Sequence, residues 1–349
     1  MSSIGLNADR TASFEDVSRS PLPVRDGLNP SRIRQPDDGM WATTLDYLLE
    51  RFPQDAVRLR EKVAAGEVVD EKGVGITETS AFAPRRFVYL YRDPPVETRV
   101  PFEIDILYRD ENILVVDKPH FLASTPRGRY IAESALVRLR RDLDLPELSP
   151  AHRLDRVTAG LLLFTVHQAA RRGYQTMFAD RRVTKEYEAI ARYDAQVSTP
   201  VVVRSRIVKE RGVLKAAEIE GEPNSESRIE LIETRDSFAR YRLTPHTGKT
   251  HQLRLHMTSL GLPIHGDNFY PDFYDVAAED YSNPLRLLSK VLEFEDPKTA
   301  GCNGSKVGGP CPGRTNQAVA TRRRDPGPFH CASDTGRMEA QTAPQEETR

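Results

Sequence analysis

A single acidic side chain, Asp155, lies between two arginines in the segment His152–Gly160. The apolar run Leu161–Thr165 follows directly and predicts a buried strand. A carboxylate between guanidinium groups, in a loop that leads into a rigid strand, indicates an anion held in an electropositive cleft. The alternative is a surface loop with ordinary salt bridges, which contribute little to stability.

Two further segments carry polar side chains at regular spacing. In the row Gly248-Lys249-Thr250-His251-Gln252-Leu253-Arg254-Leu255-His256, polar and apolar residues alternate approximately from Thr250 onward, which suits a strand, although the row also suits a short helix. In Lys185-Glu186-Tyr187-Glu188-Ala189 the side chains of Lys185 and Tyr187 share one face if the chain is extended. An ordinary edge strand is the alternative interpretation of this second segment.

Together, these three segments resemble the signature of the RluA-type RNA pseudouridine synthases. The pieces are His-Arg-Leu-Asp-x-x-Thr-x-Gly-Leu-Leu-Leu-Phe, Lys-x-Tyr-x-Ala and Gly-Lys-Thr-His-Gln-Leu-Arg-Leu-His. The segment Glu111–Pro119 resembles the strand and turn that open the catalytic domain of that family. The resemblance extends from about Phe102 to Pro297, with the pieces in the family's order.

The resemblance implies an isomerase that breaks the N-glycosidic bond of a uridine, turns the captured uracil and rejoins it through C5. This reaction needs no redox step and no group donor, so we expect no cofactor. One protein carboxylate can suffice, and the resemblance makes Asp155 that residue. The sequence leaves open whether Asp155 acts as a nucleophile toward the sugar or as a base on the ribose.

The resemblance implies two further catalytic residues. Arg254 is expected to pair with Asp155, because a bidentate guanidinium would keep a buried carboxylate ionised. In the alternative, Arg254 pairs with a different acid and only stabilises the fold. Tyr187 is expected to pack against the target base, where stacking contributes roughly 1–3 kcal/mol, and to move a proton during the rearrangement.

The target nucleotide must be extruded from folded RNA, at a cost of a few kcal/mol. The resemblance implies that Arg153 fills the gap, because its planar head can stack or bind phosphate better than a lysine would. The remaining substrate contacts are expected from residues of the same motifs, namely His152, Arg156, Thr158, Lys185, Lys249, His251 and Leu255. Two positions differ from the commonest family pattern: Ala159 replaces serine, and Lys249 replaces arginine, which keeps the charge without the bidentate fork.

Composition indicates a protein of one main domain with additions. A chain of 349 residues with 38% hydrophobic content can bury a large core. Its formal net charge of -1 does not by itself indicate nucleic-acid binding, so an RNA footprint must be local. The basic stretch from Arg153 to Lys185 is the candidate, although a solvated helix face explains part of it.

The cysteines and histidines do not indicate a metal site. Cys302, Cys311 and Cys331 follow no zinc spacing, and the evenly spaced His246, His251 and His256 have no matching carboxylate or cysteine partner. An odd number of cysteines without a signal peptide indicates free thiols and a cytoplasmic location. No apolar run approaches the ~20 residues that a membrane span needs.

The chain divides into four predicted parts. Residues 1–35 are polar without periodicity, so we expect disorder. Residues 36–97 form a small α/β domain, with one helix around Leu45 and Leu48 and a second that begins at Val57 and ends before Gly66. This part resembles the small RNA-binding domain that often precedes the catalytic domain, and a degenerate version that only packs on the catalytic domain is the alternative.

Residues 98–297 form the predicted catalytic domain, and residues 298–349 a disordered tail without apolar periodicity. Two helices are expected near 133–142 and 167–179. Strands are expected at 113–116, 161–166, 186–191, 201–208, 228–233 and 239–243. Because few of these alternate as βαβ units, the predicted fold class is α+β, with a mixed, mainly antiparallel sheet of the pseudouridine synthase type.

Three classes of function are consistent with the motifs. An RNA pseudouridine synthase is favoured, because the polar motifs fit one another chemically. A non-catalytic RNA-binding protein on the same scaffold would not need Asp155, Tyr187 and Arg254. A carboxylate-based hydrolase of nucleosides or glycans usually needs a second carboxylate, and none lies near Asp155 in sequence. From the resemblance alone we expect large-subunit ribosomal RNA as substrate, then transfer RNA, and a monomeric enzyme.

Overall fold

The computed structural model describes residues 20–94, 96–298 and 317–321. The chain divides into two units, Met1–Val96 and Glu97–Arg349. In the described ranges, no helix has the length and apolar character needed to cross a bilayer.

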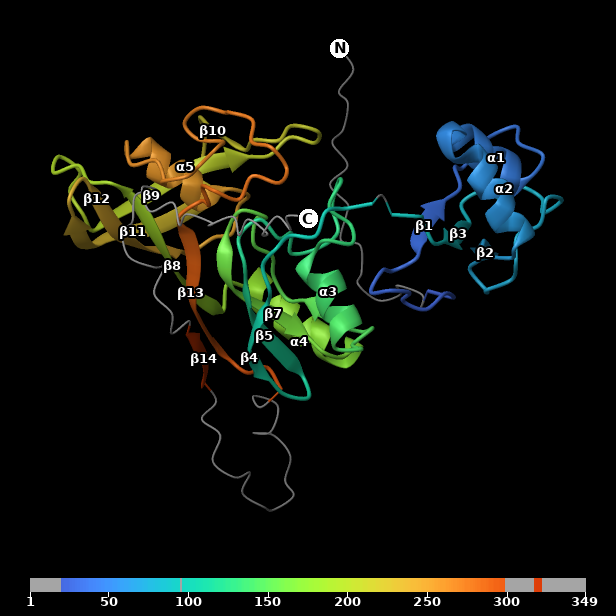
Figure 1. The fold of residues 1–349 in the computed structure, drawn as a ribbon, viewed down its shortest axis with the longest axis horizontal. Helices are drawn as coiled ribbons and strands as arrows, with labels where there is room; N and C mark the ends of the chain where they lie inside the picture. Colours follow the sequence, from blue (N-terminus) through green and yellow to red (C-terminus); the bar gives the residue numbers. More distant parts are fainter. Residues whose placement is uncertain (1–19, 95, 299–316, 322–349) are drawn as a thin grey trace, which may run out of the picture. The chain divides into compact units, whose positions relative to one another are not determined.

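The first unit packs two helices on a three-stranded antiparallel sheet of order β1-β3-β2 (Figure 1). Its elements are β1 (Ser31–Arg34), α1 (Thr44–Arg51), a 3-10 turn (Pro53–Asp55), α2 (Ala56–Ala64), β2 (Val69–Asp70) and β3 (Phe87–Leu90). Helix α1 begins at a capping box, in which the side chains of Thr43 and Asp46 each accept a hydrogen bond from the other's backbone N–H. Gly66 follows α2 with φ +71°, a conformation that glycine adopts without strain.

Strand β1 lies within residues 1–35, where the sequence predicts disorder. It pairs with β3 over four residues and buries one side chain, Ile33. A single apolar residue between Arg32 and Arg34 is too short a pattern for periodicity to detect. Residues 1–19 lie outside the described part of the chain.

The second unit is built on one large sheet of order β10-β9-β11-β12-β8-β13-β7-β5-β4, with β14 paired to β13 and β6 paired to β7. Its strands are β4 (Asp105–Arg109), β5 (Ile113–Lys118), β6 (Ser149–Pro150), β7 (Ala159–Thr165), β8 (Val183–Arg192), β9 (Val201–Val208), β10 (Ala217–Ile219), β11 (Ser225–Arg235), β12 (Phe238–Pro245), β13 (Leu287–Glu295) and β14 (Gln317–Thr321). Among the strand pairs of the described residues, β13–β7 is parallel and the others are antiparallel. The predicted α+β class with a mixed, mainly antiparallel sheet is confirmed.

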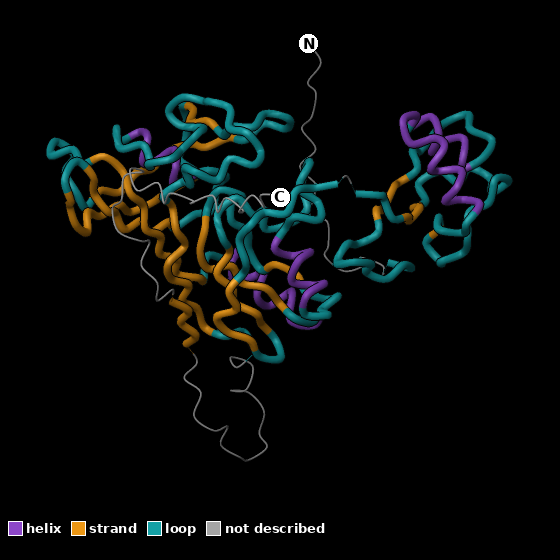
Figure 2. The backbone as a smooth tube through the Cα atoms, viewed as in Figure 1, coloured by secondary structure: helices purple, strands orange, loops and turns teal. Residues whose placement is uncertain are grey.

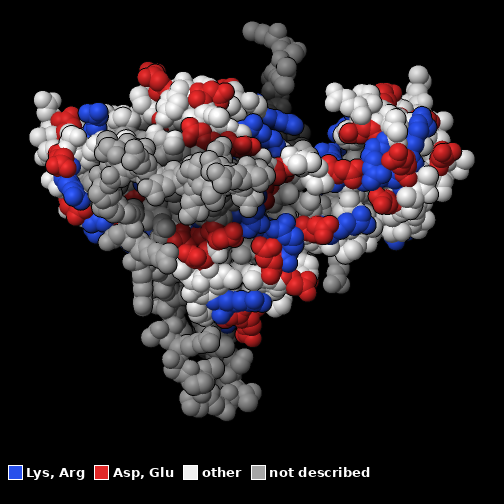
Figure 3. Space-filling view, in the orientation of Figure 1, with Lys and Arg blue, Asp and Glu red and all other residues white. Residues whose placement is uncertain are grey.

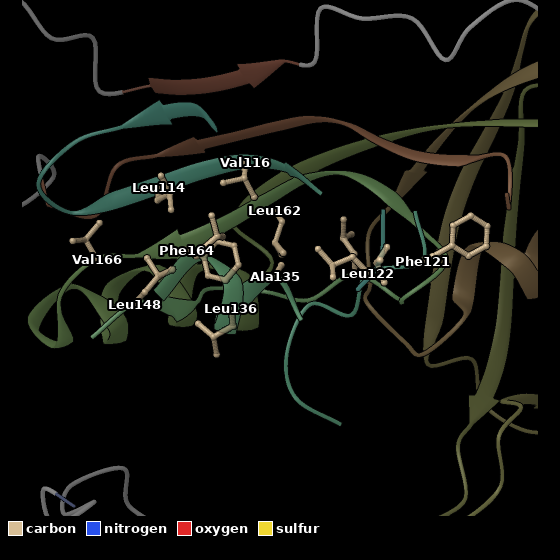
Figure 4. Close-up of a cluster of buried hydrophobic side chains, with 13 residues drawn as sticks. Leu114, Val116, Phe121, Leu122, Ala135, Leu136, Leu148, Leu162, Phe164 and Val166 are labelled. Carbon is tan, nitrogen blue, oxygen red and sulfur yellow. The ribbon is translucent and has the colours of Figure 1, made fainter. Parts of the chain in front are cut away.

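In the described part of this unit, three helices accompany the sheet, α3 (Ala135–Asp142), α4 (Gln168–Ala179) and α5 (Gln252–Ser259). Figure 2 shows how strongly strands outnumber helices in this unit. Successive residues of a strand point to opposite faces, so the continuous apolar runs of β5 and β7 can bury both faces. Leu114 and Leu162 pack with α3 on one face, as Figure 4 shows, and Val115 and Leu163 pack with α4 on the other. Burying a Leu or Val side chain contributes about 1.5–3 kcal/mol, so β7 is a rigid support for the turn that precedes it.

Strand β14 pairs antiparallel with β13 over Gln317–Thr321, within the region where the sequence predicts a disordered tail. The expectation therefore does not hold for these five residues. The physical reason is that β13 pairs with β7 at only two positions, Leu288 and Ser289, so its other end has an edge that can accept a strand. The rest of the predicted tail after residue 298 lies outside the described residues.

Candidate active site

Asp155 lies in the turn that leads into β7. The backbone N–H of Thr158 donates to the carbonyl of Asp155 at 3.1 Å and closes the turn. On the other side, Leu154 is tied through both of its backbone groups to the hydroxyl of Ser124, at 2.7 and 3.0 Å. The Asp155 side chain is 35% exposed, so a tightly held turn presents a carboxylate that a substrate can reach.

A buried lysine supports this turn from inside. Lys118, at the end of β5, is fully buried, and its Nζ donates to the carbonyls of Pro119, Leu122 and Arg156 at 2.8 to 3.3 Å. Burial lowers the pKa of Lys118 to about 7, and the nearby charge of Asp155 opposes that shift. Three carbonyls match the three donors of an ammonium group, so Lys118 links the segment after β5 to the residue next to Asp155.

Arg254 on α5 is buried, and its bidentate partner is Asp267 rather than Asp155. Its Nε donates to Asp267 Oδ2 at 2.7 Å, and its Nη2 donates to Oδ1. Both side chains are almost completely buried. The sequence-based expectation of a bidentate contact with Asp155 is therefore wrong. The chain after α5 brings Asp267 back to this helix, and the carboxylate of Asp267 pairs with the guanidinium of Arg254.

Arg254 still lies within electrostatic reach of Asp155. Burial works against its charge, but Asp267 and, more weakly, Asp155 outweigh burial, so the pKa of Arg254 is raised. The Asp267 carboxylate also accepts from the backbone N–H groups of Phe269 and Tyr270, at 2.8 and 3.1 Å. Asp267 therefore positions Arg254 and the following aromatic loop together.

The imidazole of His251 lies close to the carboxylate of Asp155. Its Nε2 lies 3.9 Å from Asp155 Oδ2, which is too long for a hydrogen bond. Its Nδ1 lies 2.9 Å from the hydroxyl of Tyr270, and its ring meets Phe269 edge to face. Burial lowers the pKa of His251, although Asp155 opposes the shift, so the imidazole is neutral at pH 7.

Tyr187 on β8 lies at the junction of two core clusters, one built around β5, β7 and α3 and the other around α5. It is paired in register with Ser289 of β13. Burial raises the pKa of Tyr187 to about 12, the neighbouring Ser289 hydroxyl lowers it, and the charge of Asp155 adds to the rise. The phenol is therefore protonated at neutral pH and is a hydrogen-bond donor near Asp155.

The expected substrate contacts fall into two groups. Arg153 and Lys249 are exposed, and Arg156 lies over the ring of Tyr130 at 4.9 Å. Lys185 is half-buried and donates to the carbonyl of Thr247 at 3.3 Å. These four cations lie on accessible parts of the surface.

The second group is packed into the protein. His152 stacks on Phe178 at 4.4 Å and accepts from the N–H of Leu163 at 3.2 Å, and burial lowers its pKa to about 3. Thr158 and Leu255 are buried. The His152 ring is partly buried and already contacts Phe178 and Leu163, so its contact with substrate stays a prediction, while the buried side chains of Thr158 and Leu255 support the turn and the core.

The sequence motifs did not identify Lys118 or Asp267 as site residues, although Lys118 lies in the motif segment Glu111–Pro119. Lys118 belongs to the Asp-Lys-Pro run that ends β5, and Asp267 follows Gly266 in the loop after α5. The sequence around these two residues does not indicate that Lys118 contacts Arg156 or that Asp267 pairs with Arg254, because each contact spans a loop whose path depends on the folded sheet. In the described ranges, no group of three His, Cys, Asp or Glu residues could hold a metal ion.

Comparison with known proteins identifies the family of the chain. Residues 112–259 match the family model described as RNA pseudouridylate synthase. A Haemophilus influenzae protein named dual-specificity RNA pseudouridine synthase RluA is 35% identical over 193 residues, covering 51% of this chain and 80% of that protein. The protein of the same name from Escherichia coli K12 is 36% identical over 168 residues, covering 47% and 76%. Among solved structures, human RNA pseudouridylate synthase domain containing 1 has a TM-score of 0.47 at 25% identity, covering 66% of this chain and 94% of that one.

The family match and the named relatives define an RNA pseudouridine synthase, an isomerase that acts on uridines in RNA. Within this class, the chain belongs to the RluA-type family.

Proposed function

We propose that this enzyme isomerises specific uridines of large-subunit ribosomal RNA, with transfer RNA as the second candidate. The relatives named above carry the description dual-specificity, which supports testing both RNA classes. Figure 3 shows basic and acidic side chains interspersed over the visible face, so recognition depends on local groups rather than on overall charge.

The arrangement around Asp155 carries the proposal. Asp155 acts at the ribose, as a nucleophile on the sugar or as a base, while the glycosidic bond breaks and the uracil is rejoined through C5. Tyr187 stacks on the captured uracil and offers its protonated hydroxyl. Arg254, held by Asp267, places a fixed positive charge behind the carboxylate. Exposed Arg153, two residues before Asp155, fills the space left by the extruded nucleotide.

The decisive experiment maps pseudouridines in total RNA from cells with and without this protein, and from cells that carry Asp155→Ala instead. We expect one or a few sites to disappear in both deficient strains and to return with the wild-type gene. Glu103→Gln is the control, because it removes a carboxylate that is 75% exposed. If no site is lost in the absence of the protein, the proposed activity is refuted, and the identity of a lost site decides between ribosomal and transfer RNA.

Further parts of the proposal concern the setting of the reaction. We take the enzyme to be a monomer in the cytoplasm, with residues 36–97 as an accessory domain beside a catalytic domain of residues 98–297. Light scattering of the purified protein tests the monomer. Deletion of the accessory domain, followed by the same RNA mapping, tests whether that domain selects the site.

A further inference from the structure

A cavity of about 560 Å³ lies where the ends of several strands of the large sheet meet. The beginning of β8, the end of β12 and the loop after it form one side, and β9 and β11 form the other. Its wall is held in place by hydrogen bonds. Asn224 exchanges two with the backbone of Ile207, at 2.9 and 3.0 Å, and the N–H of Glu226 donates to the hydroxyl of Thr247 at 2.9 Å.

The cavity has an excess of positive charge. Arg204 and His246 share one acid, Glu226, at 2.6 and 3.8 Å. Lys185 and Arg181 also line the cavity, and within the described ranges neither has an acidic partner. Lys185 donates only to a backbone carbonyl, and both burial and the charge of Arg181 lower its pKa. Two cations that repel each other in a polar hollow would be stabilised by an anion between them.

The cavity adjoins the catalytic residues. Lys185 and Tyr187 are two positions apart on β8, so their side chains share a face of the strand about 7 Å apart. The loop that closes the cavity continues from Thr247 into His251, whose ring faces Asp155. An RNA strand whose uracil is held by Tyr187 would therefore pass the cavity within a short distance along its backbone.

We propose that this cavity binds a backbone phosphate of the substrate RNA, next to the extruded uridine, through Lys185 and Arg181. The proposal rests on the proposed function, because it takes RNA as the substrate. Among the described residues, no Phe, Tyr or Trp side chain lines the cavity, and the His246 imidazole lies beside the carboxylate of Glu226, so the lining favours a phosphate over a stacked base. Cationic side chains without acidic partners instead suit a phosphodiester, which carries one negative charge and several acceptor oxygens.

The test measures how RNA affinity depends on salt, with a fluorescein-labelled RNA stem–loop that has a uridine-rich loop. Each lost phosphate contact reduces the slope of log K against log salt concentration by about 0.7–0.9. We expect Arg181→Gln to reduce the slope by that amount. Arg182→Gln is the matched control, because Arg182 is the next residue, pairs with Asp180 at 3.5 Å and does not line the cavity. It should leave the slope unchanged.

A second measurement locates the phosphate. The same RNA is prepared with one neutral methylphosphonate linkage, placed in turn on each side of the loop uridines. One of these linkages should reduce the slope for the wild-type protein by the same amount and cause no further reduction for Arg181→Gln. Equal slopes for Arg181→Gln and wild type, or additive losses at every linkage, would overturn the cavity assignment.

These results separate the cavity from the reaction. If the wild-type protein binds RNA with the predicted contribution of Arg181 but modifies no RNA, the phosphate site stands and the proposed activity fails. If modification is intact and Arg181→Gln has no effect on the slope, the activity stands and the site is refuted. Failure of the wild-type protein to bind RNA would refute both.

Discussion

Replacing Asp267 by alanine would leave the guanidinium of Arg254 buried without its partner. The side chains are 2% and 1% exposed, so solvent cannot take over the lost interaction. Breaking a buried ion pair by removing one partner costs about 3–5 kcal/mol, which lowers the folding equilibrium constant about 150- to 5,000-fold. For a unit of this size, the midpoint of thermal unfolding should fall by roughly 6–20 °C.

The double variant Arg254→Leu with Asp267→Leu separates stability from catalysis. Apolar replacement of a whole buried ion pair is often neutral, so we expect most of the stability lost in Asp267→Ala to return. Pseudouridine formation should not return, because the positive charge behind Asp155 remains absent. Asp280→Ala is the control, since this exposed acid caps only its own turn through Ser282.

The assays are urea unfolding of the purified proteins and single-turnover isomerisation of an RNA that the wild-type enzyme modifies. A loss below about 1 kcal/mol in Asp267→Ala would show that the ion pair is not the anchor of α5, since exposed pairs have that magnitude. Full activity in the stable double variant would show that Arg254 serves the fold alone.

Three further changes test the geometry around the turn. Tyr187→Phe keeps a ring for stacking but removes the protonated hydroxyl, so single-turnover rates should fall while RNA affinity changes little; equal losses in both would contradict this role. Gly160→Ala should strongly destabilise the protein in a thermal scan, because φ is +109° and the new Cβ would lie 2.2 Å from the carbonyl oxygen of Ser289, whereas Gly212→Ala, at φ +85° in open space, should cost much less. Burial lowers the pKa of His152 from 6.5 to about 3. Between pH 6.5 and pH 3 the imidazole is therefore protonated in the unfolded chain but neutral in the folded protein. The free energy of unfolding falls as the pH is lowered through this range, by about 2 kcal/mol at pH 5. His152→Phe should flatten that dependence in urea titrations at several pH values, and an unchanged slope would place the loss elsewhere.

Local sequence patterns predicted most strands of the large sheet. They did not predict strands whose alternation of buried and exposed residues is altered by pairing with other strands. Strand β13 lies between β7 and β8 in the sheet, yet its alternation is interrupted by a register shift between Ser289 and Val291. A bulge places two neighbouring residues against one partner, so a period of two no longer marks the strand. The sequence predicted disorder for the residues of the short strands β1 and β14 for a different reason. Each of these strands is stabilised by pairing with a neighbouring strand, which a local pattern does not show.

The row from His251 to His256 shows the same limit at the site itself. Its residues suited both a strand and a helix, and the structure forms helix α5, with every residue from Gln252 to Met257 buried. A helix that is buried on all sides has no polar face, so periodicity cannot select it. Packing against β9, β11 and the aromatic loop decided the outcome.

By itself, the sequence identified the family of this protein and the residues proposed to act in its reaction. Asp155, Tyr187 and Arg254 stand in motifs that can be recognised from the chain alone. Only the tertiary structure decided which groups meet. Asp267 rather than Asp155 pairs with the guanidinium of Arg254, His152 stacks on Phe178, and the buried Lys118 supports the turn. These contacts join residues that are far apart in the sequence and come together only in the folded sheet. Which acid pairs with which base then depends on the distance between them and on their burial.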